Sequence, residues 1–182
     1  MSVIELSLEE IMKCRKFALN VVETNLEKYK QRNQFNKKKI IKDIYVGKKA
    51  EIAAWKYLSN SGLNVNEPDF EIYGAKRKSF DADIKDNDND CNYHVKSMTK
   101  ESADTWGLSW SFQIEDPLVH SPEDKDKIIL CEVLDKFRVD VKIVIEATVA
   151  QGLYGIPKLY KLKRIKKVLY WDDIENYLKD NK

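Results

Sequence analysis

The sequence lacks the features that would place it in a membrane or in an oxidising compartment. No apolar run approaches the roughly 20 residues that a membrane-spanning helix needs. The amino terminus, MSVIELSLEE, is acidic and lacks the basic region and apolar stretch of a signal peptide. The three cysteines, Cys14, Cys91 and Cys131, are odd in number and widely spaced, which argues against a disulfide framework. We therefore expect a cytoplasmic protein with no membrane partner.

Several common motifs for binding or catalysis are also missing. The sequence has no glycine-rich phosphate loop, no paired Cys/His spacing of a zinc site and no nucleophilic Ser/His/Asp set. Asp86, Asp88 and Asp90 resemble the start of a calcium-binding EF-hand loop. That motif, however, needs glycine where this sequence has Cys91 and glutamate where it has Ser97. The three aspartates are therefore expected to form a polar hairpin turn.

Charge is abundant but unevenly distributed. Charged residues make up 34% of the chain and apolar residues 43%, while the formal net charge is only +2. Residues 28–49 contain nine lysines and arginines against one acid, and residues 147–171 contain six with no acid. Between these segments, residues 67–90 contain eight acids and four bases. This distribution suits either a protein that holds a polyanion at two basic edges and a metal ion in the middle, or a solvated lysine-rich surface.

The apolar spacing predicts helices first and strands afterwards. Residues 7–32 have helical spacing behind a Ser7/Glu10 capping box, residues 33–39 form a polar break, and residues 46–60 form a second helix. From residue 67 the period changes to two and predicts strands at residues 70–73, 79–85, 92–98, 108–114, 127–134 and 139–146. A final helix is expected at residues 172–178. We predict one α+β domain over residues 1–182, with a helical extension at 1–45 and a core at 46–182 whose sheet is mostly antiparallel.

Glu51 is the first candidate for chemistry. It lies in the predicted second helix on the face of Ala54, Trp55 and Leu58, because residues three, four and seven apart share one side of a helix. A carboxylate on an apolar face costs free energy unless it is paired or binds a metal ion. A boundary position beside Lys48, or an interior ion pair, is the structural alternative.

Two predicted strands carry the other candidates. Alternation in SFDADIK puts Asp81 and Asp83 on one strand face, and alternation in NYHVKSM puts His94 and Lys96 on one face of the next strand. The DNDND turn between them predicts a hairpin, which would bring the four side chains together. Carboxylates can hold a divalent cation that polarises a phosphate, and a lysine can orient the attacking water. For the two aspartates alone, an exposed polar strand face is the structural alternative.

The order of these residues resembles the PD-(D/E)XK nuclease superfamily. A helical Glu51 precedes D-A-D-I at 81–84 and H-V-K-S at 94–97, and the resemblance spans about residues 47–147. It implies a restriction-endonuclease-like fold, in which helices flank a central mixed β-sheet, and Mg²⁺-dependent hydrolysis of DNA. It assigns the metal-binding aspartate to Asp83, with Asp81 as the alternative, and the motif lysine to Lys96.

The resemblance also implies the remaining parts of a catalytic site. Glu51 matches the first-helix glutamate of several members, and the backbone carbonyl of Val95 matches a position from which members supply a metal ligand. His94 stands where the family has its second acid, so Glu51 would supply the missing carboxylate. Because histidine favours softer ions than Mg²⁺, we expect Mn²⁺ to substitute.

Together these features predict a metal-dependent DNA endonuclease, in the first place a sequence-specific enzyme of the type II restriction kind. A homing or repair nuclease of the same superfamily and a non-catalytic DNA-binding protein with a degenerate nuclease fold are the alternatives. A homodimer is expected, because one such site cuts only one strand of a duplex. The residues predicted to contact double-stranded DNA are Lys37, Lys38, Lys39, Lys48, Trp106, Gln113, Lys163 and Arg164. For Gln113, an exposed polar strand face is the alternative.

Overall fold

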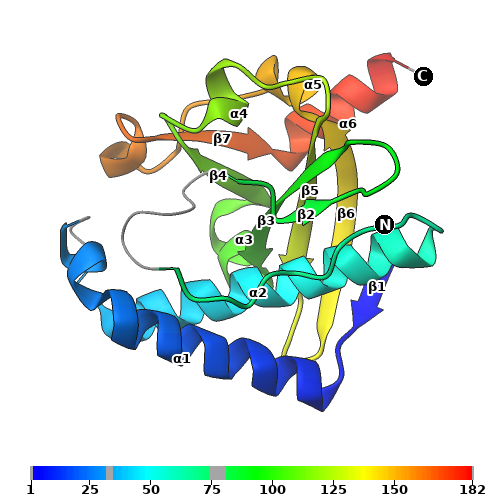
Figure 1. Ribbon diagram of the computed structural model, residues 1–182. Helices are drawn as coiled ribbons and strands as arrows, with labels where there is room; N and C mark the ends of the chain where they lie inside the picture. Colours follow the sequence, from blue (N-terminus) through cyan, green and yellow to red (C-terminus); the bar gives the residue numbers. More distant parts are fainter. Residues whose placement is uncertain (1, 32–34, 74–80, 182) are drawn as a thin grey trace.

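A five-stranded mixed sheet lies at the centre of the protein in this computed structural model, which describes residues 2–31, 35–73 and 81–181 (Figure 1). The strand order is β1-β6-β5-β3-β2. β3 and β5 are parallel, and the other neighbouring strands are antiparallel. The strands of this sheet are β1 (Ser2–Glu5), β2 (Ile84–Lys85), β3 (Asn92–Thr99), β5 (Asp126–Val133) and β6 (Arg138–Glu146).

The connection between β3 and β5 crosses one face of the sheet, as a parallel pair of strands requires. It consists of α3 (Lys100–Trp106), β4 (Ser109–Gln113) and α4 (Pro117–His120). β4 pairs with β7 (Lys166–Tyr170) in a separate antiparallel sheet of two strands. The same side of the molecule holds α5 (Ala147–Gln151), the 3₁₀ helix η1 (Tyr160–Leu162) and α6 (Trp171–Asp180).

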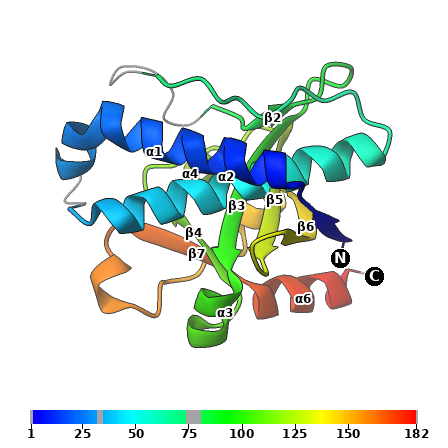
Figure 2. The same cartoon turned by 90° about the horizontal axis from the view of Figure 1, so that it is seen from below.

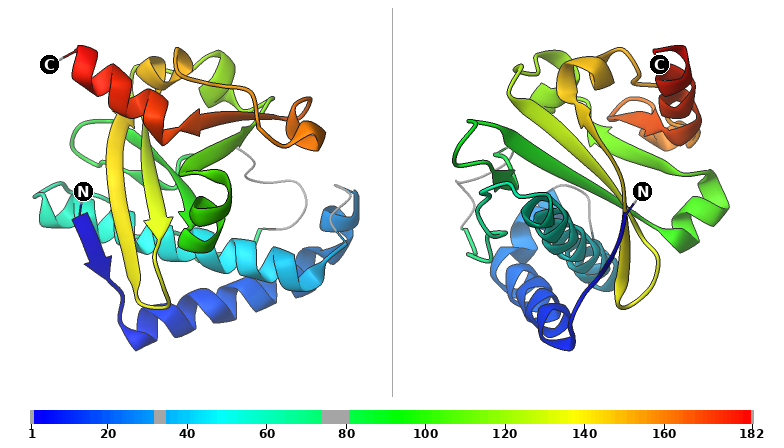
Figure 3. Two further views of the ribbon diagram at one scale, coloured as in Figure 1. Left: turned by 180° about the vertical axis from the view of Figure 1, so that it is seen from behind. Right: turned by 90° about the vertical axis from the view of Figure 1, so that its right-hand side faces the viewer.

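Two long helices, α1 (Leu8–Gln31) and α2 (Lys37–Asn60), cover the opposite face of the main sheet (Figures 2 and 3). The predicted capping box starts α1: the amide of Glu10 donates to Ser7 Oγ at 3.1 Å, and the amide of Ser7 donates to Glu10 Oε2 at 2.6 Å. Asn36 starts α2, because its side chain accepts from the amide of Lys39 at 3.0 Å. Among the described residues, no helix is long and apolar enough to cross a membrane.

The main sheet separates two apolar cores. On one face, the buried Ala53 and Ala54 let α2 approach the strands closely, and they share a core with Tyr93 and Ile129. On the other face, residues of β4, β7 and α6 pack against the residues of β5 that alternate with Ile129. This second core contains Trp110, Phe112, Ile128, Leu130, Leu169 and Ile174. Alternate residues of one strand therefore serve different cores, as the strand period of two requires.

The α+β class predicted from the sequence is confirmed, with two differences in arrangement. The sheet is mixed rather than mostly antiparallel, because the crossover through α3 and β4 makes β5 run parallel to β3. The second helix begins at Lys37 instead of residue 46, because Asn36 caps it and the apolar spacing continues through Ile40. α2 is consequently unbroken at residues 45 and 46, where we expected the extension to end.

Two of the predicted strands are absent or shorter than expected. Residues 70–73 form no strand, because the Asp69 carboxylate accepts from the amide of Glu71 at 2.7 Å and from the hydroxyl of Tyr73 at 2.6 Å. Of the strand expected at 79–85, only Ile84–Lys85 is paired, and residues 79 and 80 lie outside the described residues. The sequence prediction also omitted β1, β7 and the short helices α3, α4 and α5.

Candidate active site

A small pocket between α1, α2 and the segments that precede β2 gathers most of the predicted acids. Its volume is about 210 Å³, and its carboxylates are Glu51, Asp69, Glu71, Asp81 and Asp83. The rest of its lining is Phe17, Lys48, Tyr73 and Ala82. We call it the acidic pocket. It brings Glu51 of α2 together with the two aspartates that the sequence singled out.

Lys48 and Glu51 form an ion pair inside this pocket. They lie three residues apart on α2, and the distance from Lys48 Nζ to Glu51 Oε2 is 2.5 Å. Both side chains are largely buried, with 13% and 14% of their surfaces exposed. Lys48 Nζ also donates to the backbone carbonyl of Asp69 at 2.7 Å, and it lies 4.9 Å from the centre of the Phe17 ring. The lysine is therefore oriented by three different groups.

Ionisation of the Glu51 carboxyl group is unfavourable despite this ion pair. Burial, and after it the negative charge of Asp83, raises the pKa of Glu51 from 4.5 to about 8. The Lys48 ammonium acts in the opposite direction and only partly offsets these two effects. Two acids thus repel each other in a pocket that water reaches poorly, which is a common property of functional sites.

A backbone hydrogen bond fixes Asp83 at the edge of β3. Asp83 Oδ2 accepts from the amide of Val95 at 2.7 Å, and the amide of Asp83 donates to the carbonyl of Tyr93 at 3.0 Å. Asp83 precedes the two residues of β2, so its side chain takes the place of a strand neighbour beside Val95. Because the N–H and C=O of a strand residue point to the same side, the carbonyl of Val95 also points toward this edge.

His94 and Lys96 lie away from the acidic pocket, so the expected grouping of four side chains is wrong. His94 is 8% exposed, and its Nε2 lies 3.4 Å from Asp126 Oδ1 of β5. Lys96 Nζ lies 3.3 Å from Asp116 Oδ2 and 4.9 Å from the centre of the Phe112 ring, in the second core.

The reason for this separation is the place where β2 begins. Val95 packs into the core on the α2 side, so its neighbours His94 and Lys96 point to the other face of the sheet. The alternation within β3 was predicted correctly. Asp83, however, lies before the paired part of β2, and its carboxylate turns to the Val95 amide at the sheet edge.

The predicted DNA-contact residues fall into several places. Lys37, Lys38 and Lys39 begin α2, while Lys163 and Arg164 follow η1, and all five are exposed. Figures 1 and 2 both place the start of α2 and the η1 segment at the same end of the molecule. We call these two segments the basic arms.

The other three predicted contacts behave differently from one another. Lys48 is buried against Glu51 in the acidic pocket instead of standing on the surface. Trp106 is 46% exposed at the end of α3. Gln113 is exposed at the end of β4, where Trp110 and Phe112 are 1% exposed, so the predicted alternation of this strand is confirmed.

The donor set of the acidic pocket fits a divalent cation with few protein ligands. In the part of the chain that the structure describes, no group of three or more His, Cys, Asp or Glu residues is arranged to hold a metal ion. Mg²⁺, however, is usually bound by one or two carboxylates and several waters. Glu51 and Asp83 supply two repelling carboxylates, and the Val95 carbonyl points to the same edge.

No known protein family has a model that matches this chain, and no curated protein matches its sequence. The site must therefore be judged from its own geometry. Lys48 was predicted to contact DNA phosphates, whereas the structure pairs it with Glu51, as the structural alternative for that glutamate had it. Its spacing of three residues from Glu51 on a helix was the available signal, since such residues are neighbours on the helix surface.

Proposed function

We propose that this protein is a metal-dependent DNA endonuclease, of the sequence-specific restriction type, and that the acidic pocket is its active site. The observation that carries the proposal is the buried Glu51 beside Asp83, whose mutual repulsion a divalent cation would relieve. A mixed sheet with α1 and α2 on one face and a crossover connection on the other is compatible with a restriction-endonuclease-like fold.

This proposal assigns roles to Glu51, Asp83, Asp81 and Lys48 of the pocket. Glu51, Asp83 and the Val95 carbonyl hold Mg²⁺, for which Mn²⁺ substitutes, and Asp81 is the alternative carboxylate. The bound ion would polarise the phosphate and lower the pKa of a coordinated water. Lys48 replaces Lys96 as the lysine of the site, because its ammonium already lies beside Glu51, where it can hold a water or stabilise charge on the phosphate.

The basic arms are proposed to hold phosphates of the DNA backbone at the end of the molecule where both arms lie. Their lysines and arginine are exposed and can reach phosphates, although Lys39 already pairs with Asp43 at 2.8 Å. Phosphate contacts of this kind give strong and salt-dependent binding without base specificity. Sequence specificity would then come from other exposed polar groups, such as Gln113 at the end of β4.

A homodimer is proposed for double-strand cleavage, with α1 as the interface. Leu8, Met12 and Leu19 are 57%, 62% and 39% exposed. Their spacing of four and seven residues puts them in one stripe along the helix. An exposed apolar stripe of this kind is typical of a surface that a partner covers.

A second candidate is a DNA-binding protein without catalysis. The observation in its favour is that the two polar residues of the β3 motif are engaged elsewhere, His94 with Asp126 and Lys96 with Asp116. This candidate keeps the basic arms but gives the acidic pocket only a structural role.

Plasmid cleavage in the presence of Mg²⁺ or Mn²⁺ separates the two candidates. The wild type should produce nicks or discrete fragments, and sequencing of the fragment ends should give one recognition site. Asp83→Asn, Glu51→Gln and Lys48→Met should each reduce the rate by about a hundredfold or more. Lys96→Met should leave the rate within a few fold of the wild type.

The matched controls are Lys100→Met and Asp104→Asn, which remove the partners of an exposed ion pair on α3. Both should cleave at the wild-type rate. Retention of DNA with no cleavage in either ion would refute the enzyme and favour the second candidate. Loss of cleavage in Lys96→Met, with activity retained in Lys48→Met, would return the lysine role to Lys96. Thermal unfolding of each variant distinguishes these results from misfolding.

A further inference from the structure

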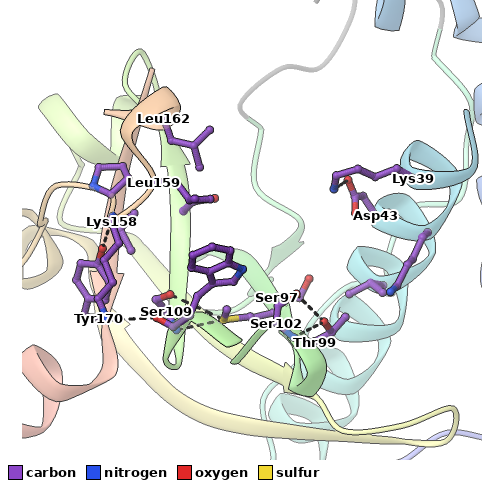
Figure 4. Close-up of a pocket in the computed structure, with 17 residues that line it drawn as sticks. Lys39, Asp43, Ser97, Thr99, Ser102, Ser109, Lys158, Leu159, Leu162 and Tyr170 are labelled. Atoms are coloured by element: carbon purple, nitrogen blue, oxygen red, sulfur yellow. Dashed lines mark hydrogen bonds and ion pairs between the residues drawn. The ribbon is translucent and has the colours of Figure 1, made fainter. Parts of the chain in front are cut away.

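A second cavity, larger than the acidic pocket, lies between α2 and the sheet of β4 and β7. Its volume is about 440 Å³, within the range of roughly 300–1,000 Å³ that is usual for ligand pockets. Figure 4 shows Lys39 and Asp43 on one side, Leu159, Leu162 and Tyr170 on the other, and serine and threonine side chains at the base. We call this cavity the serine cleft.

The serine cleft and the acidic pocket use different faces of α2. Lys42 lines the cleft and Glu51 lines the pocket. Nine residues separate them, which is about two and a half turns of an α-helix, so the two side chains leave the helix on opposite sides. The cleft is therefore a separate site, and it can be altered without changing the acidic pocket.

Positive charge is in excess around the cleft. Three lysines line it, and Asp43 is the only acid in its lining. Lys39 pairs with Asp43 at 2.8 Å, and Lys42 pairs with Glu101 at 2.9 Å on the exposed surface. Lys158 Nζ donates to the carbonyl of Trp106 at 3.2 Å and has no carboxylate partner among the described residues. A ligand with a phosphate group would supply the missing negative charge.

The base of the cleft offers hydroxyl groups for further hydrogen bonds. Ser109 and Ser111 point away from the buried side of β4, as the alternation of this strand requires. The hydroxyls of Ser97 and Ser111 have no hydrogen-bond partner in the described part of the chain. A hydroxyl both donates and accepts, so this surface suits a ligand with mixed donors and acceptors, such as the edge of a nucleobase or a sugar.

Part of the cleft wall is apolar and includes an exposed tryptophan. Trp106, at the end of α3, leaves 46% of its surface exposed. Met98, Leu159 and Leu162 add further apolar surface. A flat aromatic ring next to lysines and hydroxyls is the combination with which proteins bind unpaired bases, because every base has a face that can stack.

We propose that the serine cleft binds one nucleotide that has left the base stack of DNA, either unpaired or turned out of the duplex. Its base lies against Trp106, its polar edge meets the serine hydroxyls, and its phosphate lies near Lys158 and Lys42. An intact duplex is too wide for a cavity of this volume, and an uncharged apolar ligand would leave Lys158 without a counter-charge. The identity of the polymer as DNA rests on the proposed function.

Equilibrium binding in EDTA tests the cleft without any cleavage. Fluorescence anisotropy is measured with three labelled duplexes that share one sequence: fully paired, with one unpaired nucleotide, and with an abasic site in place of that nucleotide. The unpaired nucleotide should tighten binding by about tenfold over the paired duplex, as the stacking of a single base allows. The abasic duplex should lose this preference, because it keeps the phosphate and lacks the base.

Variants then test whether the preference for the unpaired nucleotide arises in the serine cleft. Trp106→Ala should abolish it, and Ser111→Val, which keeps a strand-forming residue at an exposed position, should weaken it severalfold. The matched control is Phe137→Ala, since Phe137 is 42% exposed in the turn between β5 and β6, outside the cleft. It should behave as the wild type.

The outcomes separate this proposal from the nuclease proposal. Equal affinity for the three duplexes would refute the proposal that the serine cleft binds a nucleotide, and so would a preference that survives Trp106→Ala. Neither result would bear on the nuclease proposal, which plasmid cleavage tests. If the plasmid stays intact while the preference for the unpaired nucleotide persists, the nuclease proposal is refuted and the nucleotide-binding proposal is supported. A protein that binds none of the three duplexes contradicts the proposal of a DNA-binding cleft outright.

Discussion

Replacing Glu51 by glutamine tests whether burial and repulsion by Asp83 destabilise the charge of Glu51 in the acidic pocket. Burial and the charge of Asp83 raise the pKa of Glu51 from 4.5 to about 8. The folded chain therefore binds the proton of the Glu51 carboxyl group more tightly than the unfolded chain does. Ionisation of Glu51 makes the folded state less stable as the pH rises from 4.5 to about 8, and the loss is complete above that window. Glutamine has the same shape and no charge, so it should remove this loss.

The size of the effect follows from the two pKa values. pH 7 lies about 2.5 units above the unfolded-state pKa of 4.5. Because one unit corresponds to about 1.4 kcal/mol, ionisation of Glu51 costs the folded state roughly 3 kcal/mol at this pH. The attraction of the Lys48 ammonium lowers the pKa of Glu51 and is therefore already included in this value. We therefore expect Glu51→Gln to unfold with a free energy about 3 kcal/mol above the wild type at pH 7. The gain should be larger at pH 9 and absent near pH 4.5.

Urea denaturation at pH 5, 7 and 9 measures this difference. The matched control is Glu23→Gln, which removes an exposed carboxylate from α1 and should change stability equally little at each pH. Adding Mg²⁺ at high pH should raise the stability of the wild type and not that of Glu51→Gln, because a cation that binds the folded state stabilises it. A glutamine variant that is less stable than the wild type by a pH-independent amount would refute the reasoning.

Two further predictions concern the surfaces of the proposed complex. Changing Lys37, Lys38 and Lys39 together to glutamine should reduce the slope of log K against log salt concentration by about two to three, since each phosphate contact contributes about 0.9. Filter binding over a salt series measures the slope, and an unchanged slope contradicts a role for this arm. Met12→Lys should convert a dimer to a monomer in light-scattering measurements at equal concentration, whereas Lys13→Met, which leaves the stripe intact, should not. A wild type that is monomeric throughout removes α1 as an interface.

Local sequence patterns predicted the parts of this structure that local interactions determine. The Ser7/Glu10 capping box forms because both partners lie within one helical turn. The burial of Trp110 and Phe112 against the exposure of Gln113 follows from the strand period alone. The placement of Glu51 on the inner side of a helix was predictable for the same reason.

Contacts between distant segments decided what could not be predicted. Lys96 pairs with Asp116, which follows it by twenty residues in the crossover connection, and nothing in the β3 sequence indicates that partner. The short β2 gives the hairpin only two paired residues, so the period-two rule could not be extended back to Asp83. A strand that begins only at Ile84, after both aspartates, changes which side chains can meet.

The two carboxylates of the acidic pocket are held by different means, and this bears on how each should be altered. Glu51 is positioned by α2, so its place depends on a helix that packs against the sheet along much of its length. The carboxylate of Asp83 is held by one hydrogen bond from the Val95 amide, just before the paired residues of β2 begin. Alanine at position 83 would therefore remove a charge and also leave a strand amide without its acceptor. Asparagine removes the charge but can still accept from that amide, so a loss of cleavage in Asp83→Asn reports on the carboxylate and not on the edge of the sheet.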